Sequence, residues 1–229
     1  MGTLIKFAQL PGIPYQNENQ RMVRVVFVGS NLGSKCLLTY ENSAYFAQGR
    51  SPAHADDTSE EIIYFRRGAG VVQLDAQKIT VRAGSAVGVP RSRLHCVENP
   101  EKDFMEHWLL GADISQQRTS SAPPAIRNGR FLVKPGPESG LECLSCRRVE
   151  LALERTGEAE VFEHHESVYA VNAGCGIVQV STPDGKYSWE YAIDASTAFW
   201  LPAKSQHCFR NTGDCTLILT GFHASVGAP

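Results

Sequence analysis

Four polar residues in the first half of the chain have types and a spacing that suit metal chemistry. His54, Asp56 and Glu61 flank a turn between two β-rich runs, and His95 follows a proline turn further along the chain. Imidazole and carboxylate groups from separate strands can converge on one divalent ion, and two imidazoles with one carboxylate leave positions open for substrate, water or dioxygen. By themselves these residues also fit a plainer interpretation, in which the histidines are hydrogen-bonded or exposed and residues 56–61 form a solvated acidic loop.

The elements that would position these residues are short β-rich runs separated by turns, with no helical period between them. Such a pattern predicts an all-β sandwich or barrel. The predicted strands are Val23–Val28, Lys35–Tyr40, Glu61–Phe65, Gly70–Leu74, Lys78–Val81, Ala86–Val89, Phe104–Leu110, Leu141–Leu153, Ser167–Val171, Gly176–Val180, Ser188–Ile193, Ala198–Leu201 and Cys215–Phe222.

An internal repeat divides the chain into two halves. Gly68–Leu74 matches Gly174–Val180, and Pro90–Asn99 matches Pro202–Asn211, with Pro, His, Cys and Asn at the same spacing in both copies. Two matches at nearly the same offset indicate two copies of one small β domain. A polar, Pro- and Ser-rich stretch between them indicates a linker. We therefore predict a first barrel at 1–112, a linker at 113–129 and a second barrel at 130–229.

The repeated Pro90 segment resembles the second sequence motif of the cupin superfamily. Gly84, Pro90, His95 and Asn99 keep every spacing of that motif, and Ser92 replaces one of its glycines. Because the repeat covers both halves, the chain resembles a bicupin. The resemblance implies two double-stranded β-helix (jelly-roll) barrels in tandem.

The first cupin motif precedes it in the expected order. His54, Glu61 and Gly68 occupy motif positions, Asp56 stands where a second histidine is usual, and Gln48 stands where the motif begins with glycine. The resemblance implies that His54, Glu61 and His95 bind a divalent metal ion. Asp56 then has three possible roles: a fourth ligand, an acceptor behind the ligands, or a base beside a three-ligand metal.

The second half departs further from the cupin pattern. Glu163 and His165 fall at the two histidine positions, Ser167 falls at the glutamate position, and His207 keeps its place although Lys204 replaces a glycine. A second site from Glu163, His165 and His207 is one interpretation. The missing glutamate favours a degenerate barrel that is kept for structure or dimerisation.

Two arginines lie on the turn that leads into His95. A guanidinium pairs with a carboxylate in a planar fork, so Arg91 and Arg93 could hold an acidic substrate over the metal. Two solvated loop arginines are the alternative. Cys143 and Cys146 form a lone CxxC without a second pair, and residues three apart on a strand point to opposite faces, so we expect them to pack in the core. Cys96 and Cys208, which follow the motif histidines, should face away from the barrel interiors as small apolar side chains.

Composition excludes several classes of function. There are 22 Lys+Arg against 24 Asp+Glu, for a net charge of −2, so the chain has no excess of positive charge for nucleic acid, and it has no helix-turn-helix pattern. No apolar run is long enough to span a membrane, and the N-terminus lacks the pattern of a signal peptide. The seven cysteines are irregularly spaced, which favours free thiols in a reducing cytoplasm.

These observations leave two classes of function. The first is a metal-dependent enzyme that acts on a small polar, carboxylate-bearing metabolite. We favour a non-heme Fe(II) dioxygenase, because the ligand set suits iron in a site with apolar lining; Mn(II), Ni(II) or Zn(II) with isomerase, dehydratase or decarboxylase chemistry is the alternative. The second class is a cupin that binds a small ligand without transforming it. Exposed β edges need cover, so we expect a homodimer.

Overall fold

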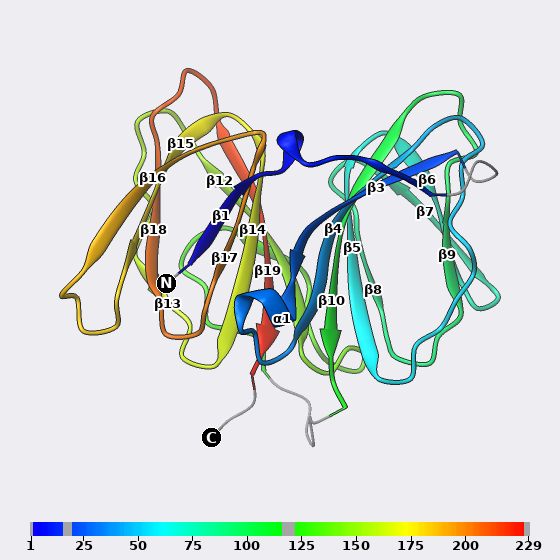
Figure 1. Cartoon of the computed structure of the whole chain (residues 1–229), viewed down its shortest axis with the longest axis horizontal. Coiled ribbons are helices and arrows are strands. Elements are labelled where there is room, and N and C mark those ends of the chain that lie inside the picture. Colours follow the sequence, from blue (N-terminus) through cyan, green and yellow to red (C-terminus); the bar gives the residue numbers. More distant parts are fainter. Residues whose placement is uncertain (1, 16–19, 116–121, 227–229) are drawn as a thin grey trace. The chain divides into compact units, whose positions relative to one another are not determined.

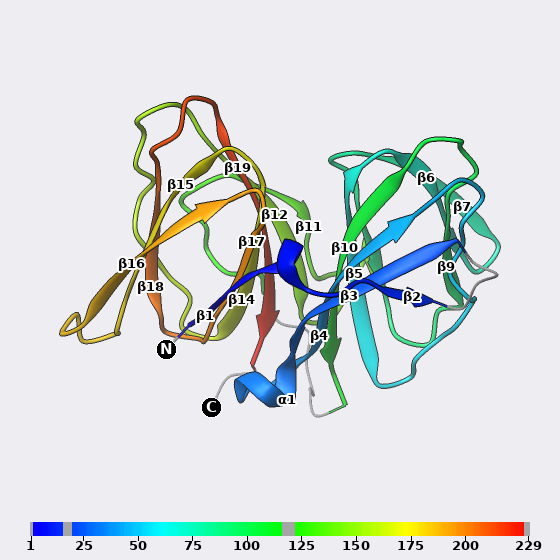
Figure 2. The same cartoon turned by 45° about the horizontal axis from the view of Figure 1, so that its top comes forward.

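The computed structural model describes residues 2–15, 20–115 and 122–226 and is nearly all β. The chain forms two barrels, each from one six-stranded and one smaller antiparallel sheet. In the first barrel the smaller sheet lies across the interior from the larger one (Figure 1 and Figure 2). The fold is therefore two double-stranded β-helix barrels in tandem, as the resemblance to cupins implied.

The first barrel contains nine strands among the described residues. Its larger sheet has the order β2-β3-β4-β10-β5-β8 and its smaller sheet the order β7-β6-β9. The strands are β2 (Ile13–Tyr15), β3 (Arg21–Val28), β4 (Leu37–Tyr45), β5 (Ser59–Arg67), β6 (Ala69–Leu74), β7 (Gln77–Arg82), β8 (Ala86–Val89), β9 (His95–Glu98) and β10 (Met105–Asp113), with one short helix, α1 (Gly29–Leu32).

The second barrel repeats this arrangement. Its sheets have the orders β1-β17-β14-β19-β12-β11 and β13-β18-β15-β16. The strands are β1 (Thr3–Lys6), β11 (Arg130–Val133), β12 (Leu144–Leu151), β13 (Glu160–Val161), β14 (His165–Ala173), β15 (Cys175–Ser181), β16 (Ser188–Asp194), β17 (Thr197–Leu201), β18 (Gln206–Asn211) and β19 (Leu217–Ser225), and a 3₁₀ turn, η1 (Phe7–Gln9), follows β1.

Inward-facing aliphatic and aromatic side chains fill both barrels. Ile63 and Phe65 on β5 pack with Val87, Leu109 and other buried residues in the first barrel. Tyr169, Phe199 and Phe209 are part of the equivalent cluster in the second barrel. Because successive strand residues alternate between faces, the interior side chains of β5 are those in phase with Ile63. Glu61 is one of them.

The two compact units are not contiguous in sequence, which differs from the predicted ranges 1–112 and 130–229. Leu10–Ser120 and Val133–Leu144 form the unit of the first barrel, whereas Met1–Gln9, Ser121–Leu132 and Ser145–Pro229 form the unit of the second. The part of the predicted linker at residues 116–121 lies outside the described residues.

The N-terminal strand belongs to the second barrel because it supplies that barrel's edge strand. Thr3–Lys6 pairs antiparallel with Thr197–Trp200 of β17, and Figure 1 shows β1 lying along β17. Lys6 Nζ also donates to Asp194 Oδ2 at 2.7 Å and to Thr197 Oγ1 at 2.8 Å. A local sequence pattern could not reveal this pairing, since the partners lie at opposite ends of the chain.

The segment 133–144 is held to the first barrel by one buried carboxylate. Glu60 is 1% exposed and accepts hydrogen bonds from the backbone N–H groups of Glu142, Cys143 and Leu144 at 2.6–2.7 Å. Glu60 and Glu61 are adjacent on β5 and therefore point to opposite faces. One carboxylate anchors a loop, and its neighbour faces the barrel interior.

Removing the Glu60 carboxylate should destabilise the first barrel. We expect Glu60→Ala to lower the free energy of unfolding by about 2–3 kcal/mol, because buried N–H donors lose their acceptor. Urea unfolding measures the loss, and hydrogen exchange should quicken at residues 142–144. The exposed Glu101 offers the control variant Glu101→Ala. A Glu60→Ala protein as stable as this control would contradict the anchoring role.

Candidate metal centre

The three predicted metal ligands meet at one point in the first barrel. Glu61 lies on β5 between Gly111 of β10 and Val89 of β8. His54 and His95 face each other through an isolated antiparallel bridge, with His54 N–H to His95 O at 3.0 Å and His95 N–H to His54 O at 2.9 Å. This bridge brings together two histidines that the chain separates widely.

Their ligand atoms lie within coordinating reach of one another. One donor atom each from His54, Glu61 and His95 lies within 4.8 Å of the other two, and no other group of this kind was found among the described residues. His95 Nε2 is 3.2 Å from Glu61 Oε2, and His54 Nε2 is 4.0 Å from Glu61 Oε1. The His95 side chain is 5% exposed and that of His54 is 51% exposed, so the cluster opens to solvent on the His54 side.

Both imidazoles are oriented by backbone carbonyls. His54 Nδ1 lies 3.3 Å from the carbonyl of Pro52, and His95 Nδ1 lies 3.2 Å from the carbonyl of Arg93. A carbonyl oxygen accepts a hydrogen bond from Nδ1–H, and this tautomer leaves the Nε2 lone pair of each ring to bind a metal. With the Glu61 carboxylate, this donor set fits a divalent transition metal.

The contact between His95 and Glu61 also affects protonation. Burial lowers the pKa of His95, but the hydrogen bond and negative charge of Glu61 outweigh it, with help from the Arg93 carbonyl, and the pKa is raised above its ordinary value. A positive charge is therefore favoured where His95 meets Glu61.

Asp56 does not join the three ligands. Its Oδ1 accepts hydrogen bonds from Thr58 N–H at 2.7 Å, Thr58 Oγ1–H at 2.8 Å and Ser59 N–H at 3.2 Å. These bonds lower the pKa of Asp56 below its usual range. The carboxylate closes the turn before β5. This geometry supports none of the three roles at the metal that the sequence left open.

We expect Asp56→Ala to affect folding more than metal binding. Loss of the turn hydrogen bonds should cost about 1 kcal/mol of stability, as for other side chains that cap backbone N–H groups. The affinity for Mn(II), measured by calorimetry, should stay within about threefold of wild type, since ligand loss costs far more than that. A large fall in Mn(II) affinity with unchanged stability would contradict this expectation and indicate that Asp56 is a metal ligand.

Arg91 and Arg93 are engaged in ion pairs. Arg91 Nη2 is 3.1 Å from Glu142 Oε1, and Arg93 Nε contacts Asp75 Oδ2. Both arginine side chains are about half exposed. These contacts fit the loop interpretation and give no support to a substrate-binding role.

Sequence reasoning missed one interior carboxyl group. Glu41 on β4 pairs with Leu109, which pairs in turn with Ile63 on β5. Paired residues share a face of the sheet, so Glu41 projects into the interior one row away from Glu61. Burial raises the pKa of Glu41, the charge of Glu61 raises it further, and the Thr39 hydroxyl, Arg21 and His54 oppose these effects.

The second barrel has different residues at the equivalent positions. Glu160 pairs with His207 as His54 pairs with His95, so Glu160 replaces the first histidine. Gly68 and Gly174 have matching positive φ angles of 76° and 78°, and the residue seven positions earlier is Glu61 in one barrel and Ser167 in the other. The second barrel thus keeps one histidine and lacks the glutamate ligand.

A matching asparagine in each barrel aligns the strands β4 and β12. Asn99 Nδ2 donates to the carbonyl of Tyr45, and Asn211 Nδ2 donates to the carbonyl of Leu151. Four residues before these carbonyls stand Glu41 in the first barrel and Arg147 in the second. The two barrels therefore carry opposite charges at the same interior position.

Arg147 supplies a cation to the interior of the second barrel. Its side chain is fully buried and makes two hydrogen bonds of 2.8 Å to the Glu160 carboxylate. It also donates to Tyr169 Oη, which lies 2.8 Å from His207 Nε2. Burial and the charge of Arg147 lower the pKa of His207 to about 4, so this histidine is neutral at neutral pH.

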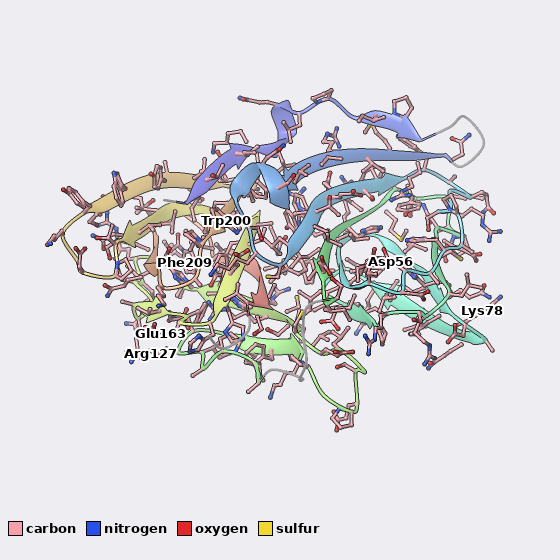
Figure 3. All side chains as sticks on the ribbon, turned by 60° about the horizontal axis from the view of Figure 1, so that its bottom comes forward. Asp56, Lys78, Arg127, Glu163, Trp200 and Phe209 are labelled. Atoms are coloured by element: carbon pink, nitrogen blue, oxygen red, sulfur yellow. The ribbon has the colours of Figure 1, made fainter. Side chains whose placement is uncertain are left out.

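The residues proposed for a second metal site do not assemble around His207. Glu163 is exposed, and Figure 3 shows it toward the outside of this barrel. His165 Nε2 lies 3.1 Å from the carbonyl of Ala122. Only His207 of the three lies in the buried network, because Glu160, and not Glu163, is its strand partner. The degenerate interpretation of this barrel fits the structure better.

The cysteines are free thiols. Cys143 and Cys146 are both buried, and burial raises the pKa of each thiol well above its ordinary value. Burial also raises the pKa of Cys96 and of Cys208. These environments suit packing and disfavour a reactive thiolate.

Comparison with known proteins agrees with this geometry. Residues 45–109 match the family model described as the cupin domain, a range that includes all three candidate ligands. The first barrel is a cupin domain, and the chain has the two-barrel fold of the cupin superfamily. No curated protein matches the chain in sequence.

Several solved structures share the fold at low sequence identity. Protein Ylba from E. coli is 11% identical, with a TM-score of 0.76 over 100% of this chain and 92% of its own. Oxalate decarboxylase from Bacillus subtilis, described with Mn(II) centres, is 13% identical, with a TM-score of 0.74 over 99% of this chain and 78% of its own. AerE from Microcystis aeruginosa is 11% identical, with a TM-score of 0.72 over 94% and 97%. At these identities the likeness concerns the fold alone.

Proposed function

We propose that the protein is a metal-dependent cupin enzyme acting on a small polar metabolite, with its catalytic centre in the first barrel. The observation that carries this proposal is the convergence of His54, Glu61 and His95 within 4.8 Å, with both imidazoles oriented to present Nε2. A divalent ion there would act as a Lewis acid or activate dioxygen. The open His54 side gives substrate a route to the ion.

Two reaction classes remain candidates. Two histidines and one carboxylate with open positions are the ligand set of non-heme Fe(II) oxygenases, which supports a dioxygenase. The interior carboxyl of Glu41 and the likeness to a decarboxylase with Mn(II) centres support decarboxylation, isomerisation or dehydration with a non-redox metal. Mn(II), Ni(II) and Zn(II) suit this second class.

One set of assays separates these candidates. The chain is loaded anaerobically with Fe(II), or separately with Mn(II), and supplied with small carboxylic acids that include oxalate. Oxygen uptake coupled to substrate loss supports the dioxygenase, and carbon dioxide release or isomerisation without oxygen uptake supports the other class. His95→Ala is the control for metal-dependent turnover. If neither metal binds the wild-type chain, the enzyme proposal fails and a non-catalytic ligand-binding cupin becomes the better description.

Three further features belong to this proposal. A carboxylate-bearing substrate would be attracted by the positive charge of a bound ion. This attraction needs no contribution from Arg91, which is paired with Glu142. The free thiols fit a reducing compartment such as the cytoplasm. A homodimer would cover the exposed sheet edges, and light scattering of the purified chain measures its mass.

A further inference from the structure

The side chain at position 41 lies on the interior face of the sheet, in the row next to that of Glu61. The equivalent residue in the second barrel, Arg147, reaches Glu160, which occupies the position of His54. A side chain from this point of the strand can therefore reach the place where the metal ligands gather. Glutamate is shorter than arginine, so Glu41 should stop short of the ligands that an arginine would touch.

The contacts of Glu41 agree with a position near the ligands but outside their shell. It is absent from the group of ligand atoms that lie within 4.8 Å of one another. Its hydrogen bond comes from Thr39 Oγ1 at 3.1 Å, and no ion pair to it is found among the described residues. Its charge interacts with those of Glu61 and His54.

The row of the sheet that contains Glu61 has a glycine on β10, whereas the row that contains Glu41 has Leu109 there. Gly111 on β10 lies between Thr39 on β4 and Glu61 on β5, in the row next to Glu41. A methyl group at Gly111 would meet Thr39 Cγ2 at 3.6 Å and no atom closer. No β10 side chain therefore stands beside Glu61, and Leu109 is the β10 side chain beside Glu41.

We infer that Glu41 is a catalytic base that accepts the proton which a substrate loses when it binds as an anion. The inference rests on the proposed function and extends it to a substrate class: oxygen acids that chelate through two oxygens, such as α-hydroxycarbonyl compounds and enediols. In this step the substrate O–H bond breaks, its electron pair stays on the substrate oxygen, and the proton bonds to a Glu41 carboxylate oxygen. The raised pKa of Glu41 makes this carboxylate a stronger base than an exposed glutamate.

The test measures proton release with a defined probe. Acetohydroxamic acid is an oxygen acid that chelates metal ions as its anion. It is titrated into the Mn(II)-loaded full-length chain by calorimetry, in two buffers with different ionisation enthalpies. We expect Glu41→Gln to release about one more proton per site than wild type, because the internal acceptor is gone. Glu98→Gln is the control, because the Glu98 side chain lies on the opposite face of β9 from His95. This variant should release as many protons as wild type.

Metal binding alone distinguishes the failure of this inference from the failure of the proposed function. Glu41→Gln should bind Mn(II) within about threefold of the wild-type affinity, because a residue outside the ligand shell contributes little. Loss of Mn(II) from this variant alone would make Glu41 a ligand and overturn the inference, while the proposed function stands. Equal proton release in both proteins, or no binding of acetohydroxamic acid to the loaded chain, would also overturn the inference. Binding of neither Mn(II) nor Fe(II) by wild type would overturn both.

Discussion

His95→Ala is expected to lower the affinity of the first barrel for Mn(II) or Fe(II) by more than about 100-fold. Loss of a residue that only hydrogen-bonds a metal ligand lowers metal affinity by up to about 100-fold. His95 is itself a ligand in the proposed site, so its loss should cost more. The remaining donors, His54 and Glu61, cannot fix the ion as three do. Metal analysis after dialysis and calorimetric titration measure the change.

The same loss should be visible in stability. A ligand at 100 times its dissociation constant stabilises the folded state by about 2.7 kcal/mol, so saturating Mn(II) should raise the melting temperature of wild type and not that of His95→Ala. His164 is exposed and lies in the other unit, so His164→Ala is the matched control. His54→Ala is a second ligand variant at a more exposed position, where a folding defect should be small. Wild-type metal content in both ligand variants would contradict the site.

Arg147→Met should destabilise the second barrel by about 3–5 kcal/mol, the usual result when one partner of a buried ion pair is removed. Arg147 is 0% exposed and Glu160 is 1% exposed, so the Glu160 carboxylate would keep its burial without its cation. Two backbone N–H groups, of Arg127 and Asn128, also bond to this carboxylate, but they carry no compensating charge. Urea unfolding of the full chain measures the loss.

A double variant tests whether the loss comes from the unpaired charge. Arg147→Met with Glu160→Leu removes both charges, and replacing a whole buried pair by apolar residues is often close to neutral. We expect the double variant to regain most of the lost stability. Trp189 and Trp200 belong to the second unit and Trp108 to the first, so fluorescence can assign the affected transition. A single variant within about 1 kcal/mol of wild type would show that the pair contributes little.

The contrast between the barrels explains why one is a candidate metal centre and the other is not. The first gathers two imidazoles and a carboxylate with no built-in cation among them, and the second places the guanidinium of Arg147 against Glu160 and Tyr169. A buried carboxylate needs a positive partner in either case. In the second barrel the chain itself supplies that partner.

The sequence by itself determined the all-β class and the duplication, and its resemblance to cupin motifs picked out the three candidate ligands. Strands with two-residue alternation and repeated turns are local patterns, and the motif spacing places His54, Glu61 and His95 without any knowledge of packing. All thirteen predicted strands overlap observed ones. The short strands β9 and β18, which carry the motif histidines, were missed because they contain few apolar residues.

Only the tertiary structure decided which other side chains share the interior. The predicted strand Lys35–Tyr40 stopped before Glu41, because the polar run Glu41–Ser43 breaks the pattern that identifies a buried strand. Arg147 and Glu160 were likewise passed over as ordinary charged residues. The position of β1 in the second barrel could not be read either. Local patterns fix periodicity and spacing, but strand register and long-range pairing determine which charges meet inside a barrel, and these depend on contacts between distant parts of the chain.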